Sequence, residues 1–213
     1  MTREITISET YKFLDDSILQ QYNESVKSSY NSEKARATLT QFGSRNGELT
    51  GSHPFMLVHL QNSSLIPGRI ATRQDLETAL RFGLNLSGHY VDFGLALKTA
   101  GDYYTPNDLL AKNLAWQLGQ RAIKLKEGKF IPISKLALKE NENSAYGLVF
   151  DLNEDEKEVE DLSKQKWIYS KNPQGLTRTH LDRYGYWISD HYYLEDSEDC
   201  GRVIVVNNSL KSQ

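Results

Sequence analysis

The stretch of sequence from 72 to 125 decides the predicted fold, because it reads in order as a helix, a strand and a helix. Thr72-Arg-Gln-Asp75 and Thr105-Pro-Asn-Asp108 each place a threonine three residues before an acid, just ahead of an apolar run. A threonine at the N-cap accepts a hydrogen bond from the first helical turn, and an acid at N3 can bond back to the cap. Helices are therefore predicted over 73–82 and 106–126.

Between these two helices lies His89-Tyr-Val-Asp-Phe-Gly-Leu-Ala-Leu97, in which large apolar side chains recur at the odd positions. Successive side chains of a strand point to opposite faces, so the odd face is predicted to face the core. The even face is small or polar at its centre. Gly94 beside Phe93 indicates that another element packs closely there. Asp92 is predicted to face water, or to need a lysine or arginine partner if it is buried.

The rest of the chain predicts an α+β fold: a single domain with a mixed or mostly antiparallel sheet of about six strands, covered by three to four helices. A chain of 213 residues can bury a sizeable core as one domain. The strand-rich second half favours this arrangement over a doubly wound sheet.

A hairpin is predicted between 184–194 and 202–206, while 2–7 and 208–213 are expected to be flexible. The further strands are predicted at 55–60, 89–98, 129–133 and 145–152, and a first helix at 8–30.

The composition argues against several classes of partner. The net charge is −3 and the isoelectric point is near 6.0, which provides no long-range attraction for nucleic acid. No apolar run approaches the ~20 residues that a membrane helix requires. The single cysteine, Cys200, suits a reducing compartment, so a cytoplasmic location is expected. Its acidic neighbours should raise the pKa of the thiol, which argues against a nucleophile.

One cluster has the residue types of a metal site. It consists of His180, Asp182, His191 and Glu195, all in the C-terminal part of the chain. Histidine and carboxylate side chains two residues apart on a strand share a face and can point at one ion. A divalent metal bound there would activate water for hydrolysis. The alternative is a hairpin with polar side chains on its solvent face, which is the more common origin of such spacings.

The C-terminal segment is also rich in aromatic residues. Alternation over 184–194 places most tyrosines on one face, which predicts that they belong to the core. Trp187, His191 and Tyr193 fall on the other face and are predicted to form an exposed patch that binds a partner.

A glycine-rich loop is predicted over 43–54. Its Arg45 and His53 could hold an anion together with backbone N–H groups, although an ordinary exposed loop explains the same composition.

No signature of a serine hydrolase, kinase, nucleotide-binding loop or zinc finger occurs, so catalysis is left open. The sequence predicts a non-catalytic intracellular protein that uses its aromatic patch to bind a protein partner or a second copy of itself, without a cofactor. The alternative is a metal-dependent hydrolase built on the His, Asp and Glu cluster.

Overall fold

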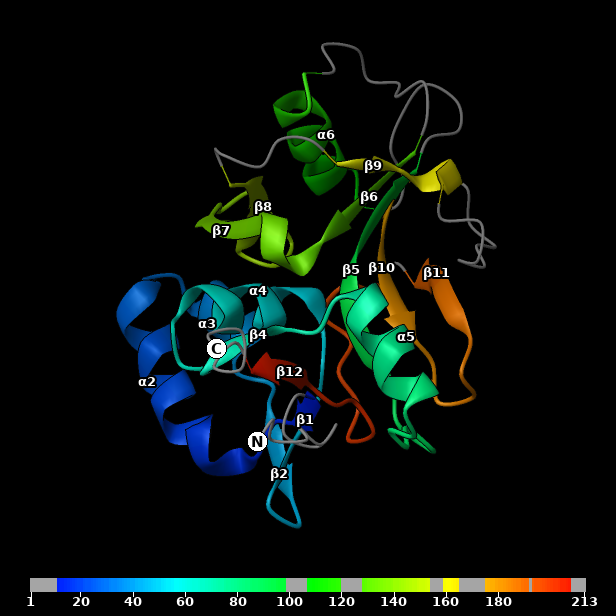
Figure 1. Cartoon of the computed structure of the whole chain (residues 1–213). Coiled ribbons are helices and arrows are strands. Elements are labelled where there is room, and N and C mark those ends of the chain that lie inside the picture. Colours follow the sequence, from blue (N-terminus) through cyan, green and yellow to red (C-terminus); the bar gives the residue numbers. More distant parts are fainter. Residues whose placement is uncertain are drawn as a thin grey trace, which may run out of the picture.

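The computed structural model describes residues 11–98, 107–119, 128–153, 159–164, 175–191 and 193–207. In this part of the chain five helices and 12 strands form an α+β fold whose sheets are antiparallel (Figure 1). The helices are α2 (Leu19–Ser29), α3 (Glu33–Leu39), α4 (Pro54–Asn62), α5 (Arg73–Arg81) and α6 (Asp108–Gln117). The strands are β1 (Tyr11–Phe13), β2 (Gly43–Arg45), β3 (Glu48–Thr50), β4 (Gly68–Ile70), β5 (Val91–Lys98), β6 (Lys129–Pro132), β7 (Leu136–Glu140), β8 (Leu148–Leu152), β9 (Glu160–Asp161), β10 (Gly175–Leu181), β11 (Trp187–His191) and β12 (Ile204–Asn207).

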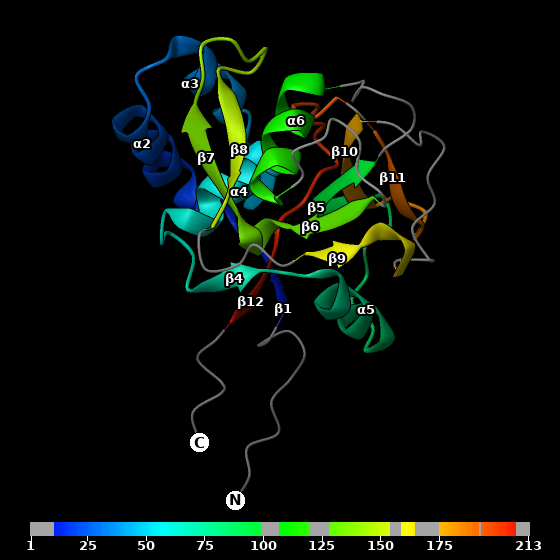
Figure 2. The ribbon, with the colours of Figure 1, turned by 90° about the horizontal axis from the view of Figure 1, so that it is seen from above.

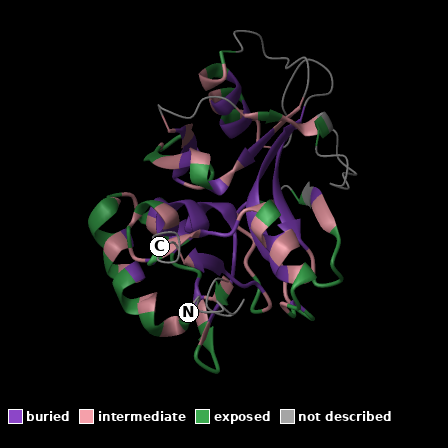
Figure 3. Cartoon of the chain, viewed as in Figure 1, coloured by how far each residue is buried: buried purple, intermediate pink, exposed green. Residues whose placement is uncertain are grey.

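The largest sheet has the order β11-β10-β5-β6-β9, so the structure has several sheets rather than one sheet of about six strands. Helix α5 covers one face of β5 through Leu76, which joins Phe93 and Leu181 in one apolar cluster. On the other face Leu95 belongs to a larger cluster with α4 and α6 (Figures 1 and 2). Every residue of β5 is buried, as the purple strand in Figure 3 shows. The predicted strand is therefore confirmed, and it is covered on both faces.

The predicted strand over 55–60 is wrong, because this segment is the helix α4. Pro54 occupies the first turn, and the side chain of His53 accepts a hydrogen bond from the backbone of Met56. All residues from 54 to 60 are buried. A short, continuous apolar run cannot distinguish a helix buried on all sides from a buried strand, because neither shows a periodic pattern.

The predicted hairpin between 184–194 and 202–206 is also wrong. Strand β11 pairs with β10, which the sequence analysis did not place among the strands, and β12 pairs with β1 and β4 in a separate sheet. Both segments do contain strands, so the error lies in the pairing. Pairing depends on segments far apart in the chain, and local pattern does not reveal it.

The capping signals were read correctly at one helix and only in part at the other. At α5, Thr72 and Asp75 form a full capping box. Helix α6 instead begins at Asp108, after Asn107 with φ of 63° and no side-chain cap. Thr105, the cap predicted there, lies outside the described residues, as do both predicted flexible ends.

The first helix is shorter than predicted. Residues 11–13 form β1, a 3-10 turn follows at Asp16–Ile18, and α2 begins at Leu19. Tyr22 and Val26, four residues apart, are the buried residues of α2.

Strand β5 contains an irregularity that changes which side chains share a face. Gly94 pairs with Thr179, but the next pair is Asp92 with His180, so Phe93 is an extra residue in β5. Such a bulge reverses the alternation on one side of itself. Asp92 therefore lies on the same face as His180. Arg178 lies on this face too, because it precedes His180 by two residues in β10. Strict alternation, as predicted from sequence, would have put Asp92 with Gly94.

The close packing predicted beside Gly94 is present. A Cβ atom at this position would lie 2.6 Å from the carbonyl oxygen of Ile131 and 2.9 Å from the ring of Phe130.

Within the described part of the chain, no helix combines the length and the apolar character needed to cross a membrane.

Replacing Thr72 by alanine should lower the free energy of unfolding by about 1 kcal/mol, because it removes the cap of α5. Urea denaturation measures this loss. Thr78→Ala in the same helix is the matched control and should be neutral or slightly stabilising, since alanine has the higher helix propensity. Equal stabilities of the two variants would contradict the role of the cap.

Candidate functional site

The buried ion pair of Arg178 and Asp92 lies at the centre of the site. Arg178 is on β10 and is 3% exposed, while Asp92 on β5 is fully buried. Nε of Arg178 donates to Oδ1 of Asp92 at 2.7 Å, and Nη2 donates to Oδ2. The hydroxyl of Ser52 donates to the same carboxylate at 2.7 Å. The prediction that Asp92 faces water is therefore wrong, and the stated alternative, an arginine partner, is what the structure shows.

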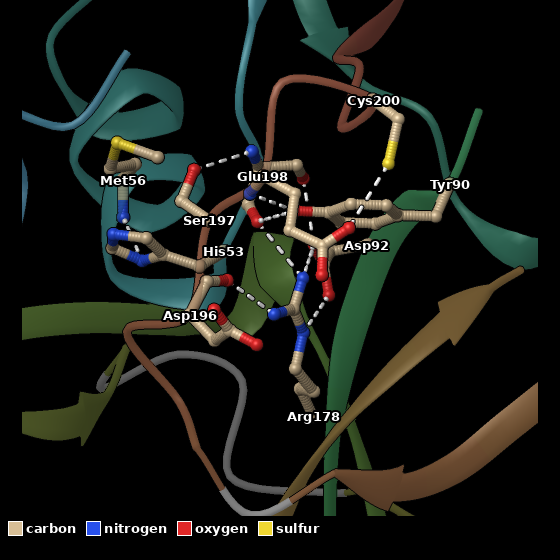
Figure 4. A network of polar contacts seen from close by, with 10 residues as sticks. His53, Met56, Tyr90, Asp92, Arg178, Asp196, Ser197, Glu198 and Cys200 are labelled. Carbon is tan, nitrogen blue, oxygen red and sulfur yellow. Dashed lines mark hydrogen bonds and ion pairs between the residues drawn. The ribbon is translucent and has the colours of Figure 1, made fainter.

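The guanidinium also binds two loops. Nη2 donates to the carbonyl oxygen of Ser52 at 2.9 Å, and Nη1 donates to the carbonyl oxygen of Asp196. Figure 4 shows the guanidinium between Asp196 and the carboxylate of Asp92. Burial alone would lower the pKa of Arg178. The charge of the Asp92 carboxylate and its hydrogen bonds outweigh burial, so the pKa is raised above its ordinary value. The arginine is therefore permanently charged, and its charge is neutralised by Asp92.

Tyr90 extends this network to the loop that precedes β12. Its hydroxyl donates to the carbonyl oxygen of Ser52 at 3.1 Å and accepts from the backbone N–H of Glu198 at 3.0 Å. Gly201 packs against Ser52 and Tyr90. A Cβ atom at position 201 would lie 2.7 Å from the backbone nitrogen of Ser52 and 2.8 Å from the ring of Tyr90. The loop is thus held in one position (Figure 4).

A pocket of about 270 Å³ lies over this network. Tyr90, His180 and Ile188 line it together with Cys200 and with four charged side chains beyond Arg178. These charged side chains are Asp182, Arg183, Asp196 and Glu198. The pocket is therefore formed by the β10–β11 hairpin on one side and the loop 193–201 on the other.

His180 is the most unusual side chain in the pocket wall. It is 8% exposed, and its Nδ1 has no hydrogen-bond partner among the described residues. Burial lowers the pKa of His180 to about 3, and the charge of Arg178 contributes to the lowering. The imidazole is therefore neutral at pH 7. Most buried polar atoms in folded proteins have a hydrogen-bond partner, so this one is unusual.

Cys200 behaves as its neighbours predict. Burial and the hydrogen bond from Sγ to Oε2 of Glu198, at 3.3 Å, raise the pKa of the thiol. The thiol is protonated at pH 7, so it is a poor nucleophile.

The structure brings three of the four predicted metal ligands into this pocket. His180, Asp182 and His191 line it, and the two imidazole rings lie 5.5 Å apart in an edge-to-face arrangement. Glu195 instead forms a hydrogen bond with Tyr146, where burial and this carboxylate raise the pKa of the phenol. Among the described residues no group of three or more His, Cys, Asp or Glu side chains is placed to hold a metal ion. The geometry therefore gives the metal-dependent hydrolase no support.

The predicted aromatic patch is divided by a second bulge. Trp187 pairs with Leu181, whereas His191 pairs with Arg178. These pairs place Trp187 and His191 on opposite faces of β11. Trp187 packs on Phe93 with ring centres 5.4 Å apart, so it belongs partly to the core. His191 is exposed beside the pocket, and Tyr193 is 56% exposed. The three residues do not form one patch, and their role in binding stays a prediction.

The tyrosines predicted to be in the core are instead among the most exposed side chains described. Tyr184 is 71% exposed and Tyr186 is 66% exposed, and we call this pair the hairpin tyrosines. Both lie in the turn between β10 and β11. The carboxylate of Asp182 accepts hydrogen bonds from the backbone N–H groups of Tyr184 at 2.9 Å and of Tyr186 at 2.7 Å. The alternating pattern fails here because these residues form a turn.

The loop predicted to hold an anion is largely a hairpin of β2 and β3. Arg45 is exposed at the end of β2. His53 is fully buried at the start of α4, where its Nε2 lies 3.0 Å from the carbonyl oxygen of Thr38. The two side chains therefore do not face one ligand.

Sequence reasoning missed Arg178 and Ser52 as members of the site. The one available signal was Asp92, an acid in the middle of an apolar strand, which requires a partner when buried. That signal names the residue type of the partner but gives no position for it.

No protein-family model matches the chain, and neither a curated protein nor a solved structure is significantly similar to it.

Replacing Arg178 by methionine should lower the free energy of unfolding by about 3–5 kcal/mol, because it leaves the carboxylate of Asp92 buried without its partner. Adding Asp92→Asn should restore part of this loss, because no buried charge then remains. Urea denaturation of the two single variants and the double variant measures the coupling.

The control is Lys112→Met, which removes the surface ion pair with Asp108 in α6 and should cost less than about 1 kcal/mol. A similarly small loss in Arg178→Met would contradict the central role of the buried pair.

Stability should fall as the pH is lowered from about 6.5 to about 5, the range in which unfolded histidine takes up protons. The pKa of His53 and that of His180 are both lowered to about 3, chiefly by burial. Below about pH 6.5 these two histidines bind protons in the unfolded chain but stay neutral in the folded protein. Each therefore lowers the free energy of unfolding by up to about 1.4 kcal/mol per pH unit. Urea denaturation over this range measures the slope, and His180→Asn should reduce it. A stability independent of pH here would contradict the burial of these histidines as neutral groups.

Proposed function

We propose that this protein is a non-catalytic binding protein, and that its binding surface consists of the pocket over Arg178 together with the hairpin tyrosines. The observation that carries the proposal is a hydrogen-bonded turn that holds two tyrosines out of the core beside a pocket lined by Tyr184 and the buried His180. Exposed tyrosines are enriched at binding sites because the ring offers a large contact area and has few rotatable bonds.

The turn itself supports this reading, because hydrogen bonds fix the backbone from which the two rings project. Besides the two bonds that the Asp182 carboxylate accepts, the backbone N–H of Gly185 donates to the carbonyl oxygen of Asp182 at 3.0 Å. Gly185 has φ of 87°, a conformation that favours glycine. A surface ordered before binding loses less conformational entropy when its partner arrives.

A second pocket, of about 460 Å³, lies beside the first turn of α5. Its described lining includes no buried polar side-chain atom that lacks a partner. A third pocket, of about 510 Å³, lies beside Phe82. Size alone would favour either of these two, but the exposed Tyr184 and the buried His180 in its wall favour the pocket over Arg178.

The partner that we propose is another protein, with a second copy of this chain as one case. A phage-displayed library of random peptides is the probe, selected on the full-length protein and then titrated against variants. Peptides selected by the wild type should lose binding to the double variant Tyr184→Ser with Tyr186→Ser by about tenfold or more, as expected of aromatic hot spots.

The matched control is Phe82→Ser. Phe82 is 66% exposed and follows α5, outside the proposed surface, so its replacement should leave peptide binding unchanged. Peptides that bind the double tyrosine variant as well as the wild type, or a selection that enriches no peptide, would count against the proposed function. Sedimentation of the wild type and the double variant tests self-association by the same surface.

A further inference from the structure

We propose that the pocket over Arg178 receives a cationic group, an ammonium or a guanidinium, from the bound partner. This inference rests on the proposed function and specifies the chemistry of its ligand. The observations that carry it are the balance of charge in the pocket wall, the two tyrosine rings in the wall and the buried His180, which carries no charge to repel a cation.

The described lining of the pocket carries an excess of negative charge. Arg178 is neutralised by Asp92, which lies beneath the pocket rather than in its wall. Beyond this pair, the part of the lining that the structure describes has three carboxylates, those of Asp182, Asp196 and Glu198, and one cation, Arg183. Arg183 is exposed at the rim. A concave surface of one sign focuses the field and attracts the opposite charge.

Two aromatic rings in the wall add a second preference for cations. The guanidinium carbon of Arg178 lies 5.1 Å from the centre of the Tyr90 ring, and that of Arg183 lies 5.1 Å from the centre of the Tyr184 ring. Both distances are within the range of cation–π attraction. The face of Tyr184 therefore already holds a guanidinium, and because Arg183 is exposed, a cation of the partner can take its place.

His180 completes the set of groups that suit a donor. Its imidazole is neutral, because burial lowers its pKa to about 3, so it does not repel a cation. An ammonium or guanidinium has only donors to offer, and the carboxylates of the wall are acceptors. The volume of about 270 Å³ lies just below the range of pockets that take drug-sized ligands, which suits a single side chain.

The test is a titration of the full-length protein with N-acetyl-lysine methylamide, followed by amide chemical shifts in NMR spectra. The matched probe is N-acetyl-norleucine methylamide, which has the same chain without the charge. The lysine derivative should shift the resonances of the pocket residues and saturate, whereas the norleucine derivative should not. Equal binding of the two probes would overturn the inference.

The double variant Asp196→Asn with Glu198→Gln should bind the lysine derivative about tenfold more weakly, because each carboxylate contributes an ion pair at the upper end of the range for exposed groups. Glu33→Gln with Glu142→Gln changes the net charge equally at exposed positions that do not line the pocket, and it should bind as the wild type does. Equal weakening by both double variants would reduce the effect to net charge and overturn the inference.

Two further arms separate the inference from the function on which it rests. Spermidine is titrated in parallel: binding of both cations supports the inference, whereas binding of spermidine alone assigns the pocket to free amines and overturns a cation supplied by the partner. If peptides selected through the hairpin tyrosines bind but contain no excess of lysine or arginine, and neither cation binds, the cationic ligand is wrong and the proposed function stands. If neither peptides nor cations bind, both fail.

Discussion

The structure depends on the ion pair of Arg178 and Asp92 more than on any other polar contact. Removing two charges from water costs several kcal/mol, and only a fully hydrogen-bonded arrangement offsets that cost. Here the carboxylate accepts from the guanidinium on both oxygens and from Ser52 as well. The remaining N–H groups of the guanidinium reach the carbonyl oxygens of Ser52 and Asp196. One side chain thus fixes segments that are far apart in the chain.

The two bulges opposite Thr179 bring this pair together with the pocket. The extra residue Phe93 in β5 turns Asp92 toward the face of Arg178, and the irregularity in β11 turns His191 toward the same face. Without these bulges Asp92 would lie beneath α5 with the apolar cluster, where no arginine is available in the observed register. Bulges are common beside functional sites because they re-aim side chains without interrupting the sheet.

The site therefore has a buried half and an exposed half with different tasks. The buried half holds the loop 193–201 against β5 and β10, and its contacts are those of a stable core. The exposed half consists of the pocket wall and the hairpin tyrosines, whose order comes from the turn at Asp182. Because the rings of Tyr184 and Tyr186 contribute little to the core, they can be exchanged without loss of the fold, and this separation makes the binding proposal testable.

The sequence by itself determined those features that depend on residues a few positions apart. The capping box of α5 and strand β5 each follow from contacts or patterns within one element. The tertiary structure alone decided that 54–60 is a buried helix, that β11 pairs with β10, and that Arg178 is the partner of Asp92. Hydrogen bonds within a turn are encoded locally, whereas strand pairing, bulges and buried ion pairs join segments whose distance along the chain carries no signal in composition or periodicity.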